Sequence, residues 1–320
     1  VAVGYAALDA SVSANHNTAI GYGALSTTTA GSNTAVGGNA LNANTSATSN
    51  TAVGYNALAL NTTGHSNVAV GALALDANTT ALGIVAVGYQ ALTSHTTGTR
   101  NTAVGHQSQY GITTGQYNTS LGYHTLTAQT TANFNTAIGA EALKGATSGG
   151  GNTAVGVVAL TANTTGTNNV AIGYPAMLTN TSGANNVAVG NDALDANTTG
   201  GNNVVLGSNA ASSNTTGAGN VYIGMNAATY SIPMTTGSYN IAIGSHSRPS
   251  ANNGVYQIVL GRNVVGGGNY TFRVGRETTY ATIALNGSAT AFTASSDIRL
   301  KENITNSTAG LSFINDLRPI

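Results

Sequence analysis

The sequence predicts an all-β protein, a parallel β-solenoid with one coil for roughly every 17 residues. The first observation is a glycine that returns from Gly4 to Gly224 at steps of 17 residues, with one step of 16 between Gly21 and Gly37. The second is the order large, small, large in the three residues before each glycine, which is typical of a half-buried strand. The third is composition, because Gly, Thr, Asn and Val are all poor helix formers.

Each repeat reads about N-T-A-V-G-Y-x-A-L-x-x-N-T-T-G-x-x. A short strand such as Thr51 to Val53 ends at the glycine, which marks a bend or a close approach of two backbones. A second apolar anchor such as Leu58 follows, and then a turn such as Asn-Thr-Thr-Gly at 61–64. Stacked coils lie about 4.8 Å apart, so the 15 steps between the first repeat glycine and Gly261 predict a rod of roughly 70 Å.

The core of a single chain is expected to be thin, because each coil supplies only two or three large apolar residues. The small strand residue, usually alanine as at Ala52 and Ala103, faces the opposite side of the strand from the Val/Ile column. We expect this alanine strip to let neighbouring chains approach closely, and the chain to form a homotrimer about its long axis. A monomeric solenoid is the alternative.

An asparagine recurs four residues before the glycine, and Ile84 interrupts this column. The pattern predicts a structural ladder in which side-chain amides bond from one coil to the next. Glycan binding by the same amides is the functional alternative. The ladder residues are Asn50, Asn67, Asn101, Asn118, Asn135, Asn152, Asn169, Asn186, Asn203 and Asn220.

The charge distribution argues against several classes of partner. The chain has nine basic and nine acidic residues, and 11 of these 18 follow Gly244, so the repeats are almost uncharged. Nucleic-acid binding and polybasic membrane contact both need clustered Lys or Arg. We therefore expect no nucleic-acid partner. No apolar run is long enough for membrane insertion.

The titratable residues do not form a recognisable catalytic or metal site. There is no cysteine, and of the six histidines only His124 and His246 share a position in the repeat. We interpret the histidines as isolated surface residues and expect no metal site and no cofactor. Asp192 and Asp195 form the closest acidic pair in the repeats, and we expect both to face solvent.

Two columns of surface side chains leave further alternatives. Six tyrosines directly follow the repeat glycine, and we favour structural packing for them over a stacking stripe for sugars. Adjacent threonines such as Thr62 and Thr63 raise the hypothesis of an ice-binding solenoid. Neighbouring strand residues point to opposite sides, however, so a flat Thr-x-Thr face is missing and ice binding is the weaker alternative. The six tyrosines are Tyr5, Tyr22, Tyr55, Tyr89, Tyr123 and Tyr174.

The chain divides into three parts by rhythm and composition. Residues 1–244 carry the 17-residue repeats, residues 245–295 form an irregular β-rich transition, and residues 296–320 change composition again. The chain begins within a repeat and without Met, so we expect it to be a piece of a longer protein.

The x-[TV]-A-[IV]-G core of the repeat resembles the head repeats of trimeric autotransporter adhesins and similar repeats of phage and viral fibres. The resemblance covers about 240 residues, through a short motif. It implies trimers of parallel β-rolls wound about a common axis, and it implies nothing about the receptor. The repeat in that family is usually shorter than 17 residues.

The stretch Ser-Asp-Ile-Arg-Leu-Lys-Glu-Asn-Ile from Ser296 resembles the opening of the endosialidase-type intramolecular chaperone domain of phage tail fibres and tailspikes. The resemblance implies a domain that assembles three chains and then often cuts itself off just before the serine. Ser296 and Lys301 match the serine and lysine of the cleavage dyad. A lysine can activate a serine hydroxyl once burial lowers its pKa. The alternative is that both residues begin a solvated helix capped by Ser-Asp.

Together these observations predict the shaft of a phage or viral tail fibre that mediates host attachment and is not an enzyme, apart from self-cleavage. Its partners would be two further copies of itself and a cell-surface receptor or glycan. We expect it on the virion surface or outside the cell. A bacterial surface adhesin of the trimeric autotransporter type is the alternative.

Overall fold

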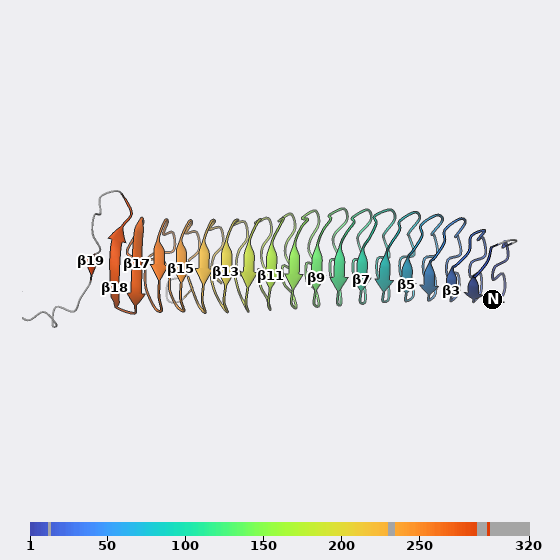
Figure 1. Ribbon diagram of the computed structural model, residues 1–320, viewed down its shortest axis with the longest axis horizontal. Helices are drawn as coiled ribbons and strands as arrows, with labels where there is room; N and C mark the ends of the chain where they lie inside the picture. Colours follow the sequence, from blue (N-terminus) through green and yellow to red (C-terminus); the bar gives the residue numbers. More distant parts are fainter. Residues whose placement is uncertain (12–13, 230–233, 287–292, 295–320) are drawn as a thin grey trace, which may run out of the picture.

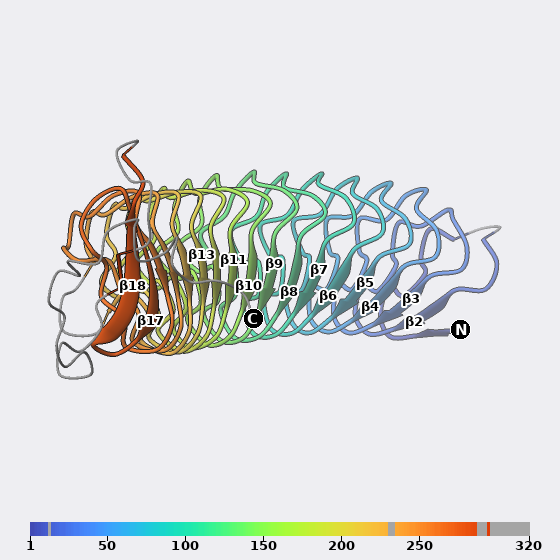
Figure 2. The ribbon, with the colours of Figure 1, turned by 60° about the vertical axis from the view of Figure 1, so that its left-hand side comes forward.

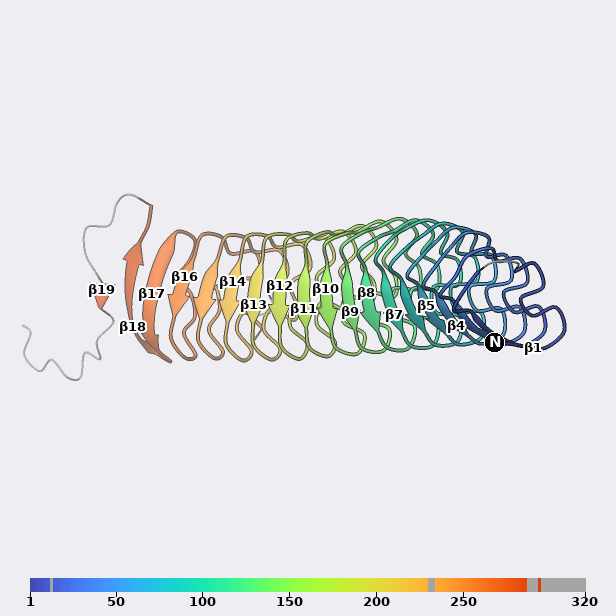
Figure 3. The same ribbon diagram turned by 45° about the vertical axis from the view of Figure 1, so that its right-hand side comes forward.

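The structure is a computed structural model, and it describes residues 1–11, 14–229, 234–286 and 293–294. The described chain forms a straight rod of stacked coils, with the strands side by side along one side of the rod in sequence order (Figure 1). Each coil is a flattened loop whose remaining sides are turns and bends (Figure 2 and Figure 3). The prediction of an all-β parallel solenoid with about 17 residues per coil is confirmed.

The described residues contain strands and turns but no helix. The strands are β1 (Ala2–Val3), β2 (Thr18–Ile20), β3 (Thr34–Val36), β4 (Thr51–Val53), β5 (Val68–Val70), β6 (Val85–Val87), β7 (Thr102–Val104), β8 (Thr119–Leu121), β9 (Thr136–Ile138), β10 (Thr153–Val155), β11 (Val170–Ile172), β12 (Val187–Val189), β13 (Val204–Leu206), β14 (Val221–Ile223), β15 (Ile241–Ile243), β16 (Ile258–Leu260), β17 (Thr271–Arg276), β18 (Thr279–Ala284) and β19 (Thr293–Ala294).

All these strands belong to one sheet, and their register follows the repeat. Ala154 of β10 pairs with Ala137 of β9 on one side and with Ala171 of β11 on the other. The parallel ladder continues past residue 244 through β16 to β17. There the chain reverses, and β17, β18 and β19 pair antiparallel at the end of the rod. In-register stacking places each residue of the repeat directly over its counterpart in the previous coil.

The middle residue of each three-residue strand faces the inside of the coil, and its two neighbours face outward. Ala137 is fully buried, whereas the adjacent Ile138 is 38% exposed. The prediction that the alanine strip faces neighbouring chains is therefore wrong. The reason is space: the leucine four residues after the glycine, such as Leu143, fills the same narrow core, and only a small residue fits with it.

The core itself shows this volume constraint where the repeat changes. Where alanine takes the place of that leucine, at Ala211 and Ala228, the strand residue of the same coil grows to Val205 and Tyr222. All four residues are fully buried. Total volume per coil is thus conserved, which is the kind of exchange that a packed core tolerates best.

A polar layer divides the apolar core into two clusters. One cluster ends at Ile112 and the other begins at Leu126. Between them Gln109 occupies the leucine position, and its Nε2 donates to Ser120 Oγ at 2.8 Å and to the carbonyl of Thr102 at 2.8 Å. The core of the rod is therefore least regular in the coils around residues 95–150.

The repeat glycines allow the coils to stack so closely. Gly156 has a φ of +138°, and a Cβ built on it would lie only 2.4 Å from the carbonyl oxygen of Gly173 in the next coil. An L-residue is strained at such a φ, by roughly 1–3 kcal/mol, and the Cβ would also collide with backbone. Glycine at this position is thus required by both conformation and space.

We predict that Gly156→Ala lowers the free energy of unfolding by at least about 3 kcal/mol, since backbone strain and a main-chain collision add. Denaturant unfolding followed by circular dichroism measures this. Gly38→Ala is the matched control, because its Cβ would make an ordinary 3.5 Å contact with the Tyr55 ring. Equal stability of the two variants would contradict the role assigned to the repeat glycine.

Candidate functional site

The proposed cleavage dyad cannot be placed, because Ser296 and Lys301 lie outside the described residues. Within the described ranges, no group of three or more His, Cys, Asp or Glu side chains is arranged to hold a metal ion. No helix of that part of the chain is long and apolar enough to cross a membrane. Candidate functional residues are therefore sought in the ladders and on the surface of the rod.

The predicted asparagine ladder lies inside the coil. Asn50 Oδ1 accepts the backbone N–H of Asn67 at 2.9 Å, and Asn50 Nδ2 donates to the carbonyl of Gly64 at 2.9 Å. The same donation to a carbonyl of the next coil, at 2.7–3.1 Å, is made by all ten ladder asparagines. Their side chains are almost fully buried. Buried, bonded amides are not accessible to a sugar, which favours the structural interpretation.

A second buried ladder was missed by the sequence reasoning, which interpreted Asn-Thr-Thr-Gly as a turn alone. Asn61 Nδ2 donates both to the carbonyl of Gly64 at 2.9 Å and to Asn44 Oδ1 at 3.2 Å. The signal was present in the sequence, since this asparagine also recurs every 17 residues. Its members are Asn44, Asn61, Asn78, Asn163, Asn180, Asn197 and Asn214.

His95 interrupts this second ladder. It is fully buried, which corrects the expectation that all the histidines lie on the surface. Asn101 Nδ2 lies 3.0 Å from His95 Nε2, and since an amide nitrogen only donates, Nε2 accepts and the imidazole is neutral. Burial lowers the pKa of His95 to about 4, and the nearby carbonyl of Gly115 opposes this only in part. His95 Nδ1 and Asn78 Oδ1 are left without hydrogen-bond partners in the described structure.

One long accessible feature is an outer strip, which we define as the first and third residues of strands β2 to β16. Every one of these residues is Thr, Val, Ile or Leu, so the strip carries no charge along its whole length. Its side chains are half-buried or exposed, and Leu121 reaches 49%. Most of its residues are aliphatic, and seven are threonines, so the strip is an uncharged and largely apolar surface. Such surfaces, when large, mark interaction sites.

Exposed aromatic rings form stacks along two columns. In the column five residues before the glycine, Tyr117 stacks on Phe134, with ring centroids 5.4 Å apart. Tyr239, Tyr256 and Tyr270 stack in the same column with separations of 5.1 and 5.2 Å. The tyrosines that follow the repeat glycine are also exposed, so they do not pack within the coil.

His106 occupies the tyrosine position directly after the repeat glycine, and His124 lies next to Tyr123 of that column. His106 stacks between Tyr89 and Tyr123, with centroids 5.3 and 5.4 Å apart, and His124 lies 4.0 Å from Tyr123. The pKa of His124 is lowered, first by partial burial and then by the charges of His106 and Lys144. Two imidazoles in an exposed stack do not provide a catalytic arrangement.

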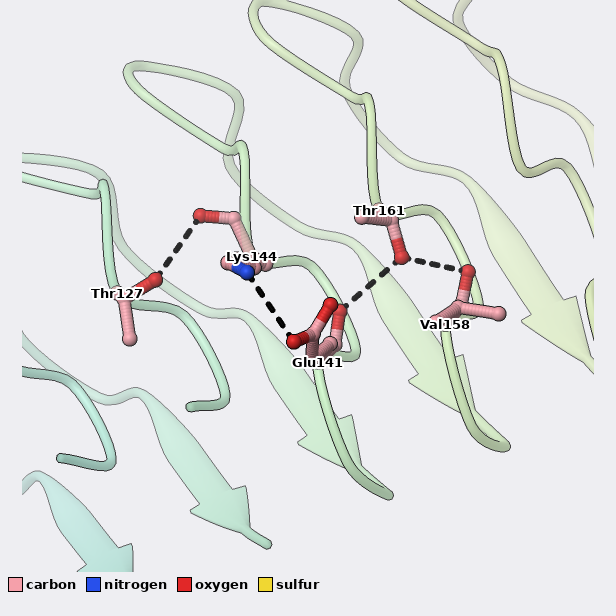
Figure 4. Close-up of polar contacts among 5 residues, drawn as sticks. All are labelled: Thr127, Glu141, Lys144, Val158 and Thr161. Carbon is pink, nitrogen blue, oxygen red and sulfur yellow. Dashed lines mark hydrogen bonds and ion pairs between the residues drawn. The ribbon is translucent and has the colours of Figure 1, made fainter. Parts of the chain in front are cut away.

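Figure 4 shows the charged pair of these coils. Lys144 Nζ lies 3.1 Å from Glu141 Oε1, and both side chains are partly exposed, so the pair adds little stability. The backbone around it is held by threonines: Thr127 Oγ1 donates to the carbonyl of Lys144 at 3.4 Å, and Thr161 Oγ1 to the carbonyls of Glu141 and Val158 at 3.1 and 2.7 Å. The arrangement is structural.

The acidic pair of the later repeats is not freely exposed. Asp192 and Asp195 are both half-buried, which differs from the expectation that they face solvent. The pKa of Asp195 is raised, mainly by burial and then by the charge of Asp192. Among the described residues no ion pair joins either carboxylate to a cation.

The threonine rows are also used within the fold. Thr62 Oγ1 donates to the carbonyl of Thr79 at 3.0 Å, and Thr164 Oγ1 to that of Thr181 at 3.0 Å. In the outer strip, Thr51 of β4 is followed by Val68 of β5, so the hydroxyl row there is broken. The second threonine of each Asn-Thr-Thr-Gly turn, such as Thr63 and Thr165, is exposed, and no side-chain hydrogen bond engages its hydroxyl among the described residues. Ice binding by this row stays the weaker alternative.

Comparison with known proteins gives no family. No protein-family model matches the chain, and no curated protein matches it.

We predict that His95→Asn stabilises the rod by about 1–3 kcal/mol at pH 7, because an asparagine here would pair the buried Asn78 Oδ1. The advantage should grow on acidification. Between pH 6.5 and pH 4 the unfolded chain binds a proton at His95 that the folded chain does not, so the wild type loses up to about 1.4 kcal/mol per pH unit.

The measurement is denaturant unfolding of wild type and His95→Asn at several pH values from 7 to 4.5. All other histidines are common to both proteins, so their contributions cancel in the difference. A stability difference that stays constant with pH would show that His95 is not a buried neutral base.

Proposed function

We propose that the chain is the shaft of a homotrimeric adhesive fibre, with a phage or viral tail fibre as the setting. The observation that carries the proposal is the unbroken parallel ladder from β1 to β17, which makes the described chain a rod. Each coil bonds only to its neighbours, so adding repeats lengthens the rod without changing its cross-section. Such an architecture suits holding a binding surface at a distance.

The outer strip supports assembly with further copies of the chain. A partner for this surface has to be apolar, uncharged and long, and has to present side chains at the coil spacing of about 4.8 Å. A second copy of the rod meets all four requirements with the same strip. We therefore propose that the strips, rather than the alanine column, face one another in the trimer.

The setting depends on the C-terminal resemblance. The stretch from Ser296 to Ile304 matches the opening of a chaperone domain that trimerises phage fibres, which favours a virion over a cell surface. A bacterial trimeric adhesin is the second candidate, because the repeats resemble both groups. The receptor would be a molecule of the host surface in either case.

We predict that replacing Ile138 and Ile172 together by Asp breaks the trimer, because two carboxylates per chain would be desolvated in an apolar contact. The two isoleucines are 38% and 39% exposed, so the coil itself should keep its fold. Native mass spectrometry of the full-length protein should show three chains for wild type and one for the variant, with circular dichroism unchanged.

Val157→Asp is the matched control. Val157 is 47% exposed but follows the glycine and lies outside the outer strip, so this variant should remain trimeric. A wild-type protein with the mass of one chain, or a double variant that still forms trimers, would refute the assembly proposed here.

We further predict that the full-length protein is cut between Ser295 and Ser296, and that Ser296→Ala and Lys301→Ala each leave it intact. Without the hydroxyl there is no nucleophile, and without the lysine there is no base. Denaturing mass spectrometry distinguishes the cut from the intact chain. Ser295→Ala is the control, because it removes only a neighbouring hydroxyl, and this variant should still be cut. A wild-type protein that stays uncut would refute the assignment of Ser296 and Lys301 as a cleavage dyad.

A further inference from the structure

The surface of the rod is interrupted at one coil where two side chains are missing together. Gly150 and Gly151 occupy the two positions directly before the buried Asn152, where neighbouring coils carry Asn133–Phe134 and Thr167–Asn168. In the described part of the chain no other coil has glycine at both positions. A hollow of about 410 Å³ results, which we name the Gly151 slot.

One wall of the Gly151 slot is the ring of Phe134. This ring is 64% exposed, more than any other large apolar side chain between β2 and β16. Its other face is supported by Tyr117, at 5.4 Å and 16° between the rings, and Arg100 in turn stacks over Tyr117. An apolar ring fixed from behind and left open in front is a ready stacking surface.

The opposite wall is polar. A Cβ on Gly151 would lie 2.5 Å from Asn168 Oδ1, so this oxygen reaches over the glycine into the slot. Asn168 Nδ2 points away and donates to Asn185 Oδ1 at 3.4 Å, and Asn168 Oδ1 has no donor among the described residues. Thr131, Ser148 and Thr167, which carry hydroxyl groups, also line the slot. The slot thus offers one apolar face and several neutral hydrogen-bonding groups.

The spacing of the walls limits the size of a ligand. Phe134 and Asn168 belong to coils two steps apart, which corresponds to about 9.6 Å. A ring stacked on Phe134 at about 3.5–4 Å leaves room for a hydroxyl to reach Asn168 Oδ1 at about 2.8 Å. One saturated ring with hydroxyl groups fits this distance, and two stacked rings do not.

We propose that the Gly151 slot binds a single neutral pyranose unit of a glycan. The C–H face of the sugar stacks on Phe134, and a hydroxyl donates to Asn168 Oδ1. A few convergent polar groups beside an apolar wall are typical of small-molecule sites. No residue lining the slot is charged, so the slot lacks the Arg or Lys that makes the strongest hydrogen bonds to phosphate or carboxylate groups.

A nucleotide would also stack on an aromatic ring but needs a basic groove for its phosphates. Arg100, the basic side chain of this column, is engaged with Tyr117: its guanidinium lies over the ring and its Nη1 donates to the phenol oxygen. The chemistry of the slot therefore favours a sugar over a nucleobase.

The surrounding coils support a functional role for this segment. Both the buried ladder and the core depart from the repeat here: His95, Ile112, Gln129 and Ala146 take the place of the second-ladder asparagine, and Gln109 that of leucine. Local departures from a consistent pattern concentrate at functional positions in natural proteins. The sugar-binding proposal depends on the proposed function in one respect only: the sugar would belong to the surface molecule that the fibre attaches to.

The experiment is saturation-transfer difference NMR on the full chain with methyl pyranosides of glucose, galactose, mannose and N-acetylglucosamine, and with adenosine monophosphate as the charged stacking probe. At least one pyranoside should bind the wild type, with saturation strongest on its C–H face. Phe134→Ala and Gly151→Asn should each weaken this binding about tenfold or more, through lost stacking and a filled slot.

The Gly151→Asn variant places in this coil the residue that the next two coils carry at the same position. Gly151 has a φ of +72°, and Asn168 and Asn185 in the same column hold asparagine at 56° and 59°. The new Cβ would collide only with the end of the Asn168 side chain, which can rotate away, so the variant should keep its fold. Tyr256→Ala removes an exposed ring from another stack and should leave pyranoside binding within about twofold. Unfolding curves of each variant verify the fold.

Absence of pyranoside binding, equal binding by Gly151→Asn, or tighter binding of adenosine monophosphate would each overturn the proposal. Native mass spectra of the same samples separate it from the proposed function. Trimers that bind no sugar would refute the sugar site and agree with the fibre proposal. Single chains that bind sugar would support the sugar site and refute the fibre proposal.

Discussion

In-register stacking of the coils is the constraint on which the rest of the structure depends. Each buried residue lies over its counterpart of the previous coil, as Ala154 lies over Ala137. A buried polar side chain can then satisfy its hydrogen bonds with an identical neighbour, and both asparagine ladders do so. Where the next coil carries another residue type at this position, the side-chain oxygen loses its partner. This happens at Asn78, which precedes His95, and at Asn214, which precedes Met234. The buried repeat is therefore conserved along the rod by hydrogen bonding as well as by packing.

The narrow cross-section imposes a second constraint, on volume. Most coils hold one large and one small apolar residue, and where alanine replaces the large one, at Ala211 and Ala228, the strand residue is larger, as Tyr222 shows. Some polar substitutions are hydrogen-bonded, such as Gln109 with Ser120, whereas the buried amide of Gln129 has no partner among the described residues. A rod built in this way has little interior in which a cavity or a catalytic cluster can form, so chemistry has to be carried on its surface.

The surface offers two kinds of feature, and they differ in regularity. The outer strip runs the length of the rod and is uniform, which suits contact with another rod. The Gly151 slot is a local interruption, with Phe134 on one side and Asn168 on the other, which suits a small ligand. They lie at different positions of the coil, since the strip is formed by the strands and the slot by the turn before them. The proposed assembly and the proposed ligand binding would thus use separate surfaces.

The sequence by itself determined the fold class, the coil length and the buried asparagine column, because a strict period leaves stacking as the only way to bury every coil. It also contained the second asparagine column, which was hidden by its resemblance to a turn motif. Only the tertiary structure decided which side of the strand faces the core. Alternation distinguishes two faces but does not say which is inside, and Ala154 is inside because Leu160 already fills the coil. The 17-residue period already stacks Phe134, Gly151 and Asn168, but only the structure showed that this column is exposed and hollowed at Gly151.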